Sequence, residues 1–143
     1  MKKFRFRLER VLQYRQVVRQ EKKRELALKI AQLREAEKRM EELRQAQIAN
    51  ALPESRAVNL DEFMLRGRYA ARLKEDIEKQ QEVMAIAQRQ VEEAREVYVE
   101  AAKEAKTLEM LKEKRKTEYE EYQNKEEDKI LDEMATQRSN FNI

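Results

Sequence analysis

Residues 70–108 read AARLKEDIEKQQEVMAIAQRQVEEAREVYVEAAKEAKTL. Steps of alternately three and four residues from Ala70 meet an apolar side chain at every position except Gln80, with charged residues between them. This spacing is the heptad repeat of a helix that packs along one seam against another helix, and it is sustained for about five heptads. The seam therefore predicts a coiled-coil helix. Its positions are Ala70, Leu73, Ile77, Gln80, Met84, Ala87, Val91, Ala94, Tyr98, Ala101, Ala105 and Leu108.

A break in the helical pattern precedes this seam. Pro53 is the only proline in the chain, and proline cannot continue a helix. Asn59 is a suitable N-cap with Glu62 three residues later, and Val58 and Phe63 occupy the positions of a hydrophobic staple. We expect a single domain made of a first helix over about residues 6–50, a connector over about 51–59, a second helix over about 60–137 and a flexible tail over 138–143.

The segment before the proline carries its own apolar stripe at helical spacing, with polar gaps at Arg15 and Lys22. Its members are Leu8, Val11, Leu12, Val18, Leu26, Ile30, Leu33, Ala36, Met40 and Leu43. If the chain folds back at residues 50–60, residue i faces roughly residue 110 − i. The N-terminal start of the first helix then faces about residue 105, close to the point where the seam fails after Leu108. The sequence predicts an all-α fold, a long antiparallel two-helix coiled-coil hairpin with a C-terminal helical overhang.

The predicted overhang carries large apolar side chains that no segment of the hairpin is expected to cover. They are Tyr119, Tyr122, Ile130, Leu131, Met134 and Phe141. Exposed aromatic and methionine side chains on a helix are typical of a docking surface. Self-association through the overhang is the alternative interpretation.

Several classes of function are excluded by composition. The chain has no Cys and no His, so thiolate or imidazole nucleophiles and metal ligands are absent. Adjacent carboxylates such as Glu92 and Glu93 point in different directions on a helix, and Gly67 is the only glycine, so no phosphate-binding loop exists. We expect no enzyme activity, no cofactor and no metal. No apolar stretch is long enough to span a bilayer, which predicts a cytoplasmic protein without membrane insertion.

Charge is distributed unevenly along the chain. Residues 1–24 contain ten Lys or Arg against two Glu, and residues 118–133 contain eight Asp or Glu against two Lys. A basic arm suggests nucleic acid or an acidic protein surface, or it is simply a solvated face. The apolar stripe through the basic arm argues against a helix that reads a DNA groove. We therefore expect no nucleic-acid partner.

Both ends of the chain resemble the FliJ family, a component of flagellar type III export. Residues 4–15 carry the spacing F-x-F-x-L-x-x-V-L-x-x-R, which is similar to the opening of that family. Residues 129–138 carry K-x-L-D-E-x-A-x-x-R, which is similar to its ending. The length, the single proline between two arms and the two-helix arrangement fit the same family.

The resemblance implies a non-enzymatic coiled coil similar to the central stalk of rotary ATP synthases. Its members dock into the hexameric export ATPase FliI, promote its assembly, link it to the export gate protein FlhA, and have been described as cycling export chaperones. It also implies a monomer in the bacterial cytoplasm that is peripheral at the cytoplasmic face of the inner membrane through the export apparatus.

The resemblance also assigns candidate residues to two docking sites. The ATPase-docking residues are Phe4, Phe6, Leu8, Leu12, Ile130, Leu131, Met134 and Arg138. The gate-docking residues are Tyr69, Leu73 and Ile77, and they are followed on the same face by the polar Gln80.

Three other functions compete with the export adaptor. The alternatives are the stalk of a related virulence-type secretion injectisome, a generic structural coiled coil that self-assembles through its overhang, and a basic nucleic-acid binder. Binding to duplex DNA that weakens with salt would identify the last of these.

Overall fold

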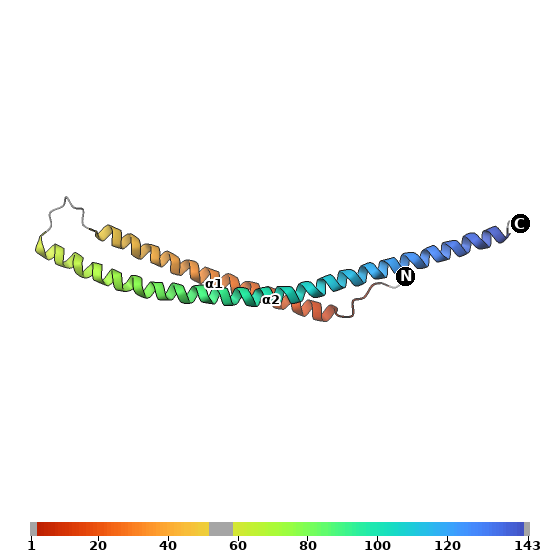
Figure 1. Ribbon diagram of the computed structural model, residues 1–143, viewed down its shortest axis with the longest axis horizontal. Helices are drawn as coiled ribbons and strands as arrows, with labels where there is room; N and C mark the ends of the chain where they lie inside the picture. Colours follow the sequence, from red (N-terminus) through yellow and green to blue (C-terminus); the bar gives the residue numbers. More distant parts are fainter. Residues whose placement is uncertain (1–2, 52–58, 142–143) are drawn as a thin grey trace. The chain divides into compact units, whose positions relative to one another are not determined.

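The computed structural model describes residues 3–51 and 59–141, which contain two long helices (Figure 1). Helix α1 spans Glu9–Asn50 and helix α2 spans Leu60–Phe141. They pack against each other, and the described residues contain no strand, so the predicted all-α helical hairpin is confirmed. Pro53 and Val58, on which the predicted break and staple depend, lie outside the described residues.

The ends of the helices differ from the expected bounds. Helix α1 begins at Glu9 rather than near residue 6, because residues 3–6 have no helical hydrogen-bonding pattern. Helix α2 continues to Phe141, so residues 138–141, predicted as part of a flexible tail, are helical. The backbone hydrogen bonds of a regular helix do not depend on a packing partner, which is why the helix outlasts its seam.

Contacts along the chain define two compact units. Unit 1 comprises Met1–Arg19 and Glu100–Ile143, and unit 2 comprises Gln20–Val99. Each unit contains one stretch of each helix in antiparallel pairing. The expectation of a single domain remains a prediction.

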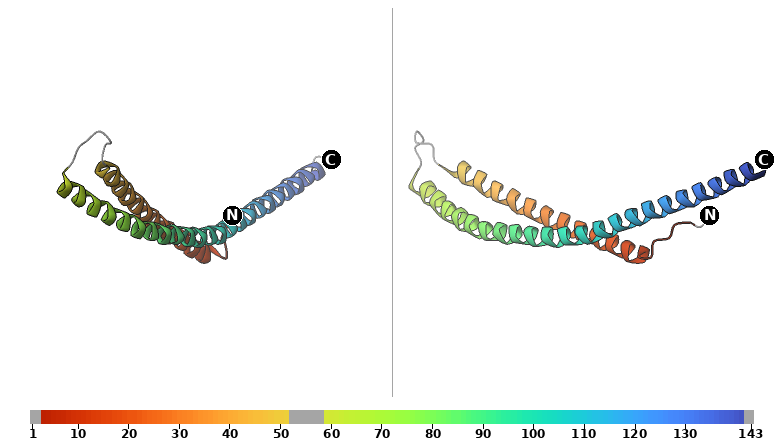
Figure 2. Two further views of the ribbon diagram at one scale, coloured as in Figure 1. Left: turned by 60° about the vertical axis from the view of Figure 1, so that its left-hand side comes forward. Right: turned by 45° about the vertical axis from the view of Figure 1, so that its right-hand side comes forward.

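In unit 2 the two helices lie side by side (Figure 2). Their buried side chains form an apolar core. The buried side chains are Ala36, Met40 and Leu43 from α1 and Leu73, Ala87 and Val91 from α2. Gln80, the polar seam position, is half-buried and its Nε2 donates to the carbonyl oxygen of Ala36 at 3.0 Å. Ala70, the first predicted seam position, is exposed, so the seam begins at Leu73.

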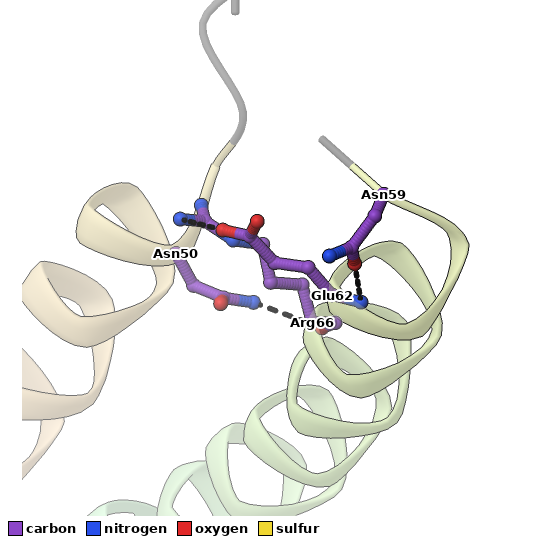
Figure 3. Close-up of polar contacts among 4 residues, drawn as sticks. All are labelled: Asn50, Asn59, Glu62 and Arg66. Atoms are coloured by element: carbon purple, nitrogen blue, oxygen red, sulfur yellow. Dashed lines mark hydrogen bonds and ion pairs between the residues drawn. The ribbon is translucent and has the colours of Figure 1, made fainter. Parts of the chain in front are cut away.

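The start of α2 is fixed by polar contacts (Figure 3). The Oδ1 atom of Asn59 accepts a hydrogen bond of 2.7 Å from the backbone N–H of Glu62, which confirms Asn59 as the N-cap. Arg66 pairs with the Glu62 carboxylate at 3.2 Å, and its carbonyl oxygen accepts from Asn50 Nδ2 at 3.1 Å. The last residue of α1 is thereby tied to the second turn of α2.

In unit 1 the core is built mostly from small side chains. Leu12 of α1 is 2% exposed, and Ala101 and Ala105 of α2 are buried, with Ala105 at 0%. Alanine lets the helix axes approach closely but gives up most of the roughly 1.5–3 kcal/mol that a buried Leu contributes. Polar pairs also cross between the two helices of this unit and are described below.

The pairing register differs from the expected 110 − i rule. That rule places Asn50 near residue 60 and Phe4 near residue 106, whereas Asn50 bonds Arg66 and Phe4 packs on Tyr119. The first crossing contact lies more than a turn inside α2, which shifts all later pairs. Residues before Glu9 are non-helical, and an extended chain advances about 3.3 Å per residue instead of 1.5 Å, which shifts Phe4 further. The uncovered part of α2 is consequently shorter than predicted, and Tyr119 is not on it.

Candidate docking surfaces

Residues 3–8 form a non-helical segment that packs on α2. Phe4, Phe6 and Leu8 are half-buried, whereas Lys3, Arg5 and Arg7 between them are exposed, which is the alternation of an extended chain. The ring centroids of Phe4 and Tyr119 are 5.8 Å apart with the planes tilted by 43°. The carbonyl oxygens of Phe6 and Leu8 accept the backbone N–H groups of Glu9 and Leu12 at 3.2 and 2.9 Å and connect the segment to α1.

This segment and α2 enclose a hollow of about 630 Å³, which we call the N-terminal groove. Its lining residues are Phe4, Arg5, Phe6, Arg7 and Leu8 together with Leu111, Arg115, Glu118, Tyr119 and Tyr122 of α2. Six of these ten side chains are apolar or aromatic, and the charged ones are three Arg against one Glu. Tyr122 is 59% exposed, so the groove is open to a partner.

Polar pairs cross between the helices next to the groove; we call them the polar ladder. Glu9 Oε2 lies 2.9 Å from Lys112 Nζ, Arg15 Nη1 lies 2.5 Å from Glu104 Oε2, and Arg19 Nη2 lies 2.7 Å from Glu109 Oε1. The hydrogen bond from Arg19, then one from Gln16 at 3.2 Å, lowers the pKa of Glu109 below its ordinary value of 4.5.

Beyond the groove, α2 continues with an exposed apolar stripe. Ile130, Leu131, Met134 and Phe141 are all exposed. A second hollow on this stretch is lined by Leu131, Met134, Ala135, Gln137, Arg138 and Phe141. Leu131, Met134, Arg138 and Phe141 follow one another at steps of three, four and three residues, so they share a helix face. We call this face the distal stripe.

A family model described as Flagellar FliJ protein matches residues 4–142. The chain belongs to the FliJ family. It is thus a component of the flagellar export apparatus, and the resemblance stated from its two ends is confirmed. None of the curated proteins and none of the solved structures compared with the chain matches it.

The match to the FliJ family begins at Phe4, the first residue of the segment that lines the groove. In the described ranges, no three His, Cys, Asp or Glu side chains are grouped so that they could hold a metal ion. Neither α1 nor α2 has an apolar stretch long enough to cross a membrane.

The residues predicted to dock to the ATPase fall into three environments. Phe4, Phe6 and Leu8 line the N-terminal groove, and Ile130, Leu131, Met134 and Arg138 lie on exposed turns of α2. Leu12 is in the core of unit 1. The groove and the distal stripe share no lining residue, so they are two neighbouring surfaces along α2.

The residues predicted to dock to the gate are also divided. Tyr69 is 46% exposed, Ile77 is half-buried, and Leu73 is 4% exposed because it packs in the core of unit 2. Four exposed apolar side chains precede Tyr69 in α2, namely Leu60, Phe63, Met64 and Leu65. Leu60, Met64 and Leu65 do not follow the seam spacing, and that departure was the signal that could have assigned them to the surface. Phe63 does follow it, seven residues before Ala70, and gave no such signal.

The groove itself was missed by sequence reasoning. The alternation of Phe4, Phe6 and Leu8 with Lys3, Arg5 and Arg7 has a period of two, which is typical of an extended segment. We instead predicted a helix from about residue 6, with Tyr119 uncovered. The prediction that Tyr122 is exposed is confirmed, because its side chain is 59% exposed. The period of two was the available signal.

Proposed function

We propose that the chain is the non-enzymatic adaptor of the flagellar export apparatus that docks into the ring of the export ATPase, promotes ring assembly and couples the ring to the export gate. The observation that carries this proposal is the sequence of surfaces along α2 in unit 1. An apolar groove with a basic rim is followed by the exposed distal stripe. Apolar surface of this kind is stabilised when a partner removes it from water.

The ATPase role is tested by acidic substitutions on each surface. The variants F4D/F6D and M134D place carboxylates where an apolar contact is proposed, and L28D makes the same kind of change at an exposed position in unit 2. We expect F4D/F6D and M134D to abolish stimulation of the cognate ATPase while circular dichroism shows helicity near wild type, and L28D to retain stimulation. Full stimulation by F4D/F6D and M134D would remove both surfaces from the docking role.

The gate role is proposed for Tyr69 together with the half-buried Ile77. Because Tyr69 is exposed and Leu73 is in the core, substitutions at these two residues distinguish the loss of a gate contact from the loss of fold stability. We expect Y69A to weaken gate binding without changing the melting temperature or ATPase binding. L73A should lower the melting temperature and weaken both interactions. A Y69A variant that binds the gate as tightly as wild type would contradict the assignment.

The proposal includes a bacterial cytoplasmic location, peripheral to the inner membrane through the apparatus, and an escort role toward export chaperones. It also includes a monomeric chain. Light scattering over a concentration series distinguishes a monomer from a generic coiled coil that self-assembles through the distal stripe. The mass of the monomer stays constant, whereas the mass of the self-assembling coiled coil increases with concentration.

A further inference from the structure

The rim of the N-terminal groove carries positive charge that the rest of the described chain does not neutralise. Arg5 and Arg7 are exposed and form no ion pair with any residue in ranges 3–51 and 59–141. Arg115 differs, because its Nη1 lies 3.3 Å from Glu118 Oε2. The two N-terminal guanidinium groups are therefore available to an anionic partner, and guanidinium binds carboxylates in two-pronged geometry.

The floor of the same groove is apolar and aromatic. Phe4 and Phe6 alternate with the two arginines, and Tyr122 faces the same hollow from α2. A ligand that fills the groove must thus present an apolar group and a negative charge within a few ångströms of each other. A peptide segment with a large apolar side chain next to Asp or Glu satisfies both requirements.

A nucleic-acid strand fits the surroundings less well. Bases stack on aromatic rings and phosphates pair with arginine, but a strand extends past its binding site. Beyond the groove the strand would follow residues 123–133, where five carboxylates oppose two lysines. A protein segment with one or two carboxylates contacts only the Arg5 and Arg7 rim and avoids that repulsion.

We propose that the N-terminal groove binds an acidic, apolar segment of the export ATPase, with the apolar side chain on Phe4, Phe6 and Tyr122 and the carboxylates on Arg5 and Arg7. This inference rests on the proposed function and specifies the chemistry of its partner. It places recognition in the non-helical segment, where the alternating side chains supply both kinds of contact.

A matched pair of charge reversals tests the rim. R5E/R7E reverses the two groove arginines, and K23E/R24E reverses two exposed cations in unit 2, so each variant changes the formal net charge of +3 by the same amount. We expect R5E/R7E to weaken binding to the cognate ATPase hexamer about tenfold or more and to lose most of its salt dependence, and K23E/R24E to change affinity by about twofold at most. Circular dichroism checks that both variants fold.

Direct contact with carboxylates is tested by zero-length coupling. A carbodiimide activates a carboxylate, an amine in contact with it forms an amide, and the reagent leaves as a urea. R5K and R7K keep the positive charge and supply that amine, and R10K supplies one at an exposed position outside the groove. We expect mass spectrometry to find amides from the R5K and R7K variants to Asp or Glu of the ATPase, and none from R10K.

The outcomes separate this inference from the proposed function. A wild-type chain that does not bind the ATPase would overturn both. Wild-type binding that R5E/R7E and K23E/R24E weaken equally, or coupling only from R10K, would overturn the groove assignment and leave the adaptor role in place. A single-stranded oligonucleotide whose binding is abolished by R5E/R7E, with ATPase binding unchanged, would replace the acidic segment with nucleic acid.

Discussion

Individual side chains of unit 1 show how a polar position can support a helix pair. Arg15 interrupts the apolar stripe of α1, yet it is half-buried because it forms an ion pair with Glu104 on α2. Glu109 similarly accepts hydrogen bonds from Arg19 and Gln16. The apolar stripe showed that Arg15 is a polar residue at a packing position. Its partner depends on the alignment of the two helices, which the pattern of one helix does not report.

Glu109 gives the fold a defined response to acid. Its pKa is lowered, chiefly by the Arg19 hydrogen bond, so its contribution to stability is present above the ordinary value of 4.5 and is lost as pH falls through the lower folded value. We expect the E109Q variant to lose less stability than wild type as the pH falls below about 4.5. At pH 7 the substitution should lower the free energy of unfolding by less than about 1 kcal/mol, because solvent screens the pair. Thermal melts across pH measure this. E113Q, at an exposed position, is the control, and equal acid dependence in both variants would contradict the prediction.

Gly67 offers a second test at this scale. It lies within α2, its φ is not positive, and a Cβ added there would meet no atom within 4 Å. Glycine inside a helix is less favourable than alanine by roughly 0.5–1 kcal/mol. We expect G67A to raise the free energy of unfolding by about that amount in chemical denaturation. A lower stability would show that the position needs glycine for another reason.

At the scale of elements, the helix type and the seam were predictable, and the N-terminal segment was not. From Leu73 to Leu108 every predicted seam position of α2 is buried or half-buried, because repeated three- and four-residue steps leave one consistent face. Phe4, Phe6 and Leu8 are only three positions, too few to define a face by repeated spacing. Their burial depends on Leu111 and Tyr119, more than a hundred residues away, which local periodicity does not report.

The alanine seam of unit 1 sets a limit on the side chains it accepts. Ala105 is fully buried in the helix pair of unit 1. We expect A105L to destabilise the fold by about 1–3 kcal/mol, because the added carbon atoms must force the helices apart. A71L, at an exposed position of α2, should be close to neutral. Denaturant midpoints compare the two, and an A105L variant more stable than wild type would mean that the pair is not tightly packed there.

At the scale of the whole molecule, two long helices and a fold-back were predictable from one break and two stripes, whereas the register was not. The 110 − i rule assumed a symmetrical turn and helical residues throughout, and both the Asn50 to Arg66 contact and the extended N-terminal segment depart from it. The family resemblance assigned the ATPase-docking residues to one site, and the structure distributes them over the groove, the core and the distal stripe.

Deletion of residues 124–143 tests the independence of the distal part of α2. From Ile130 to Phe141 every side chain is exposed, so an isolated helix there is held only by its own hydrogen bonds. We expect the shortened chain to melt within a few degrees of wild type and to stimulate the ATPase less. Hydrogen exchange of the full chain should show fast exchange at 130–141 and slow exchange around Ala105. A large drop in melting temperature would show that the distal residues support the pair.

The polar ladder also bears on how the helix pair of unit 1 resists mechanical load. Alanine surfaces such as those at Ala101 and Ala105 are smooth, so they offer little resistance to one helix sliding lengthwise past the other. Besides the packing of Leu12 and of Phe4 on Tyr119, the guanidinium, ammonium and carboxylate contacts at Glu9, Arg15 and Arg19 oppose this sliding in unit 1. Stiffness along this stretch is thereby linked to the ionic composition of the surrounding fluid, because dissolved ions weaken such contacts.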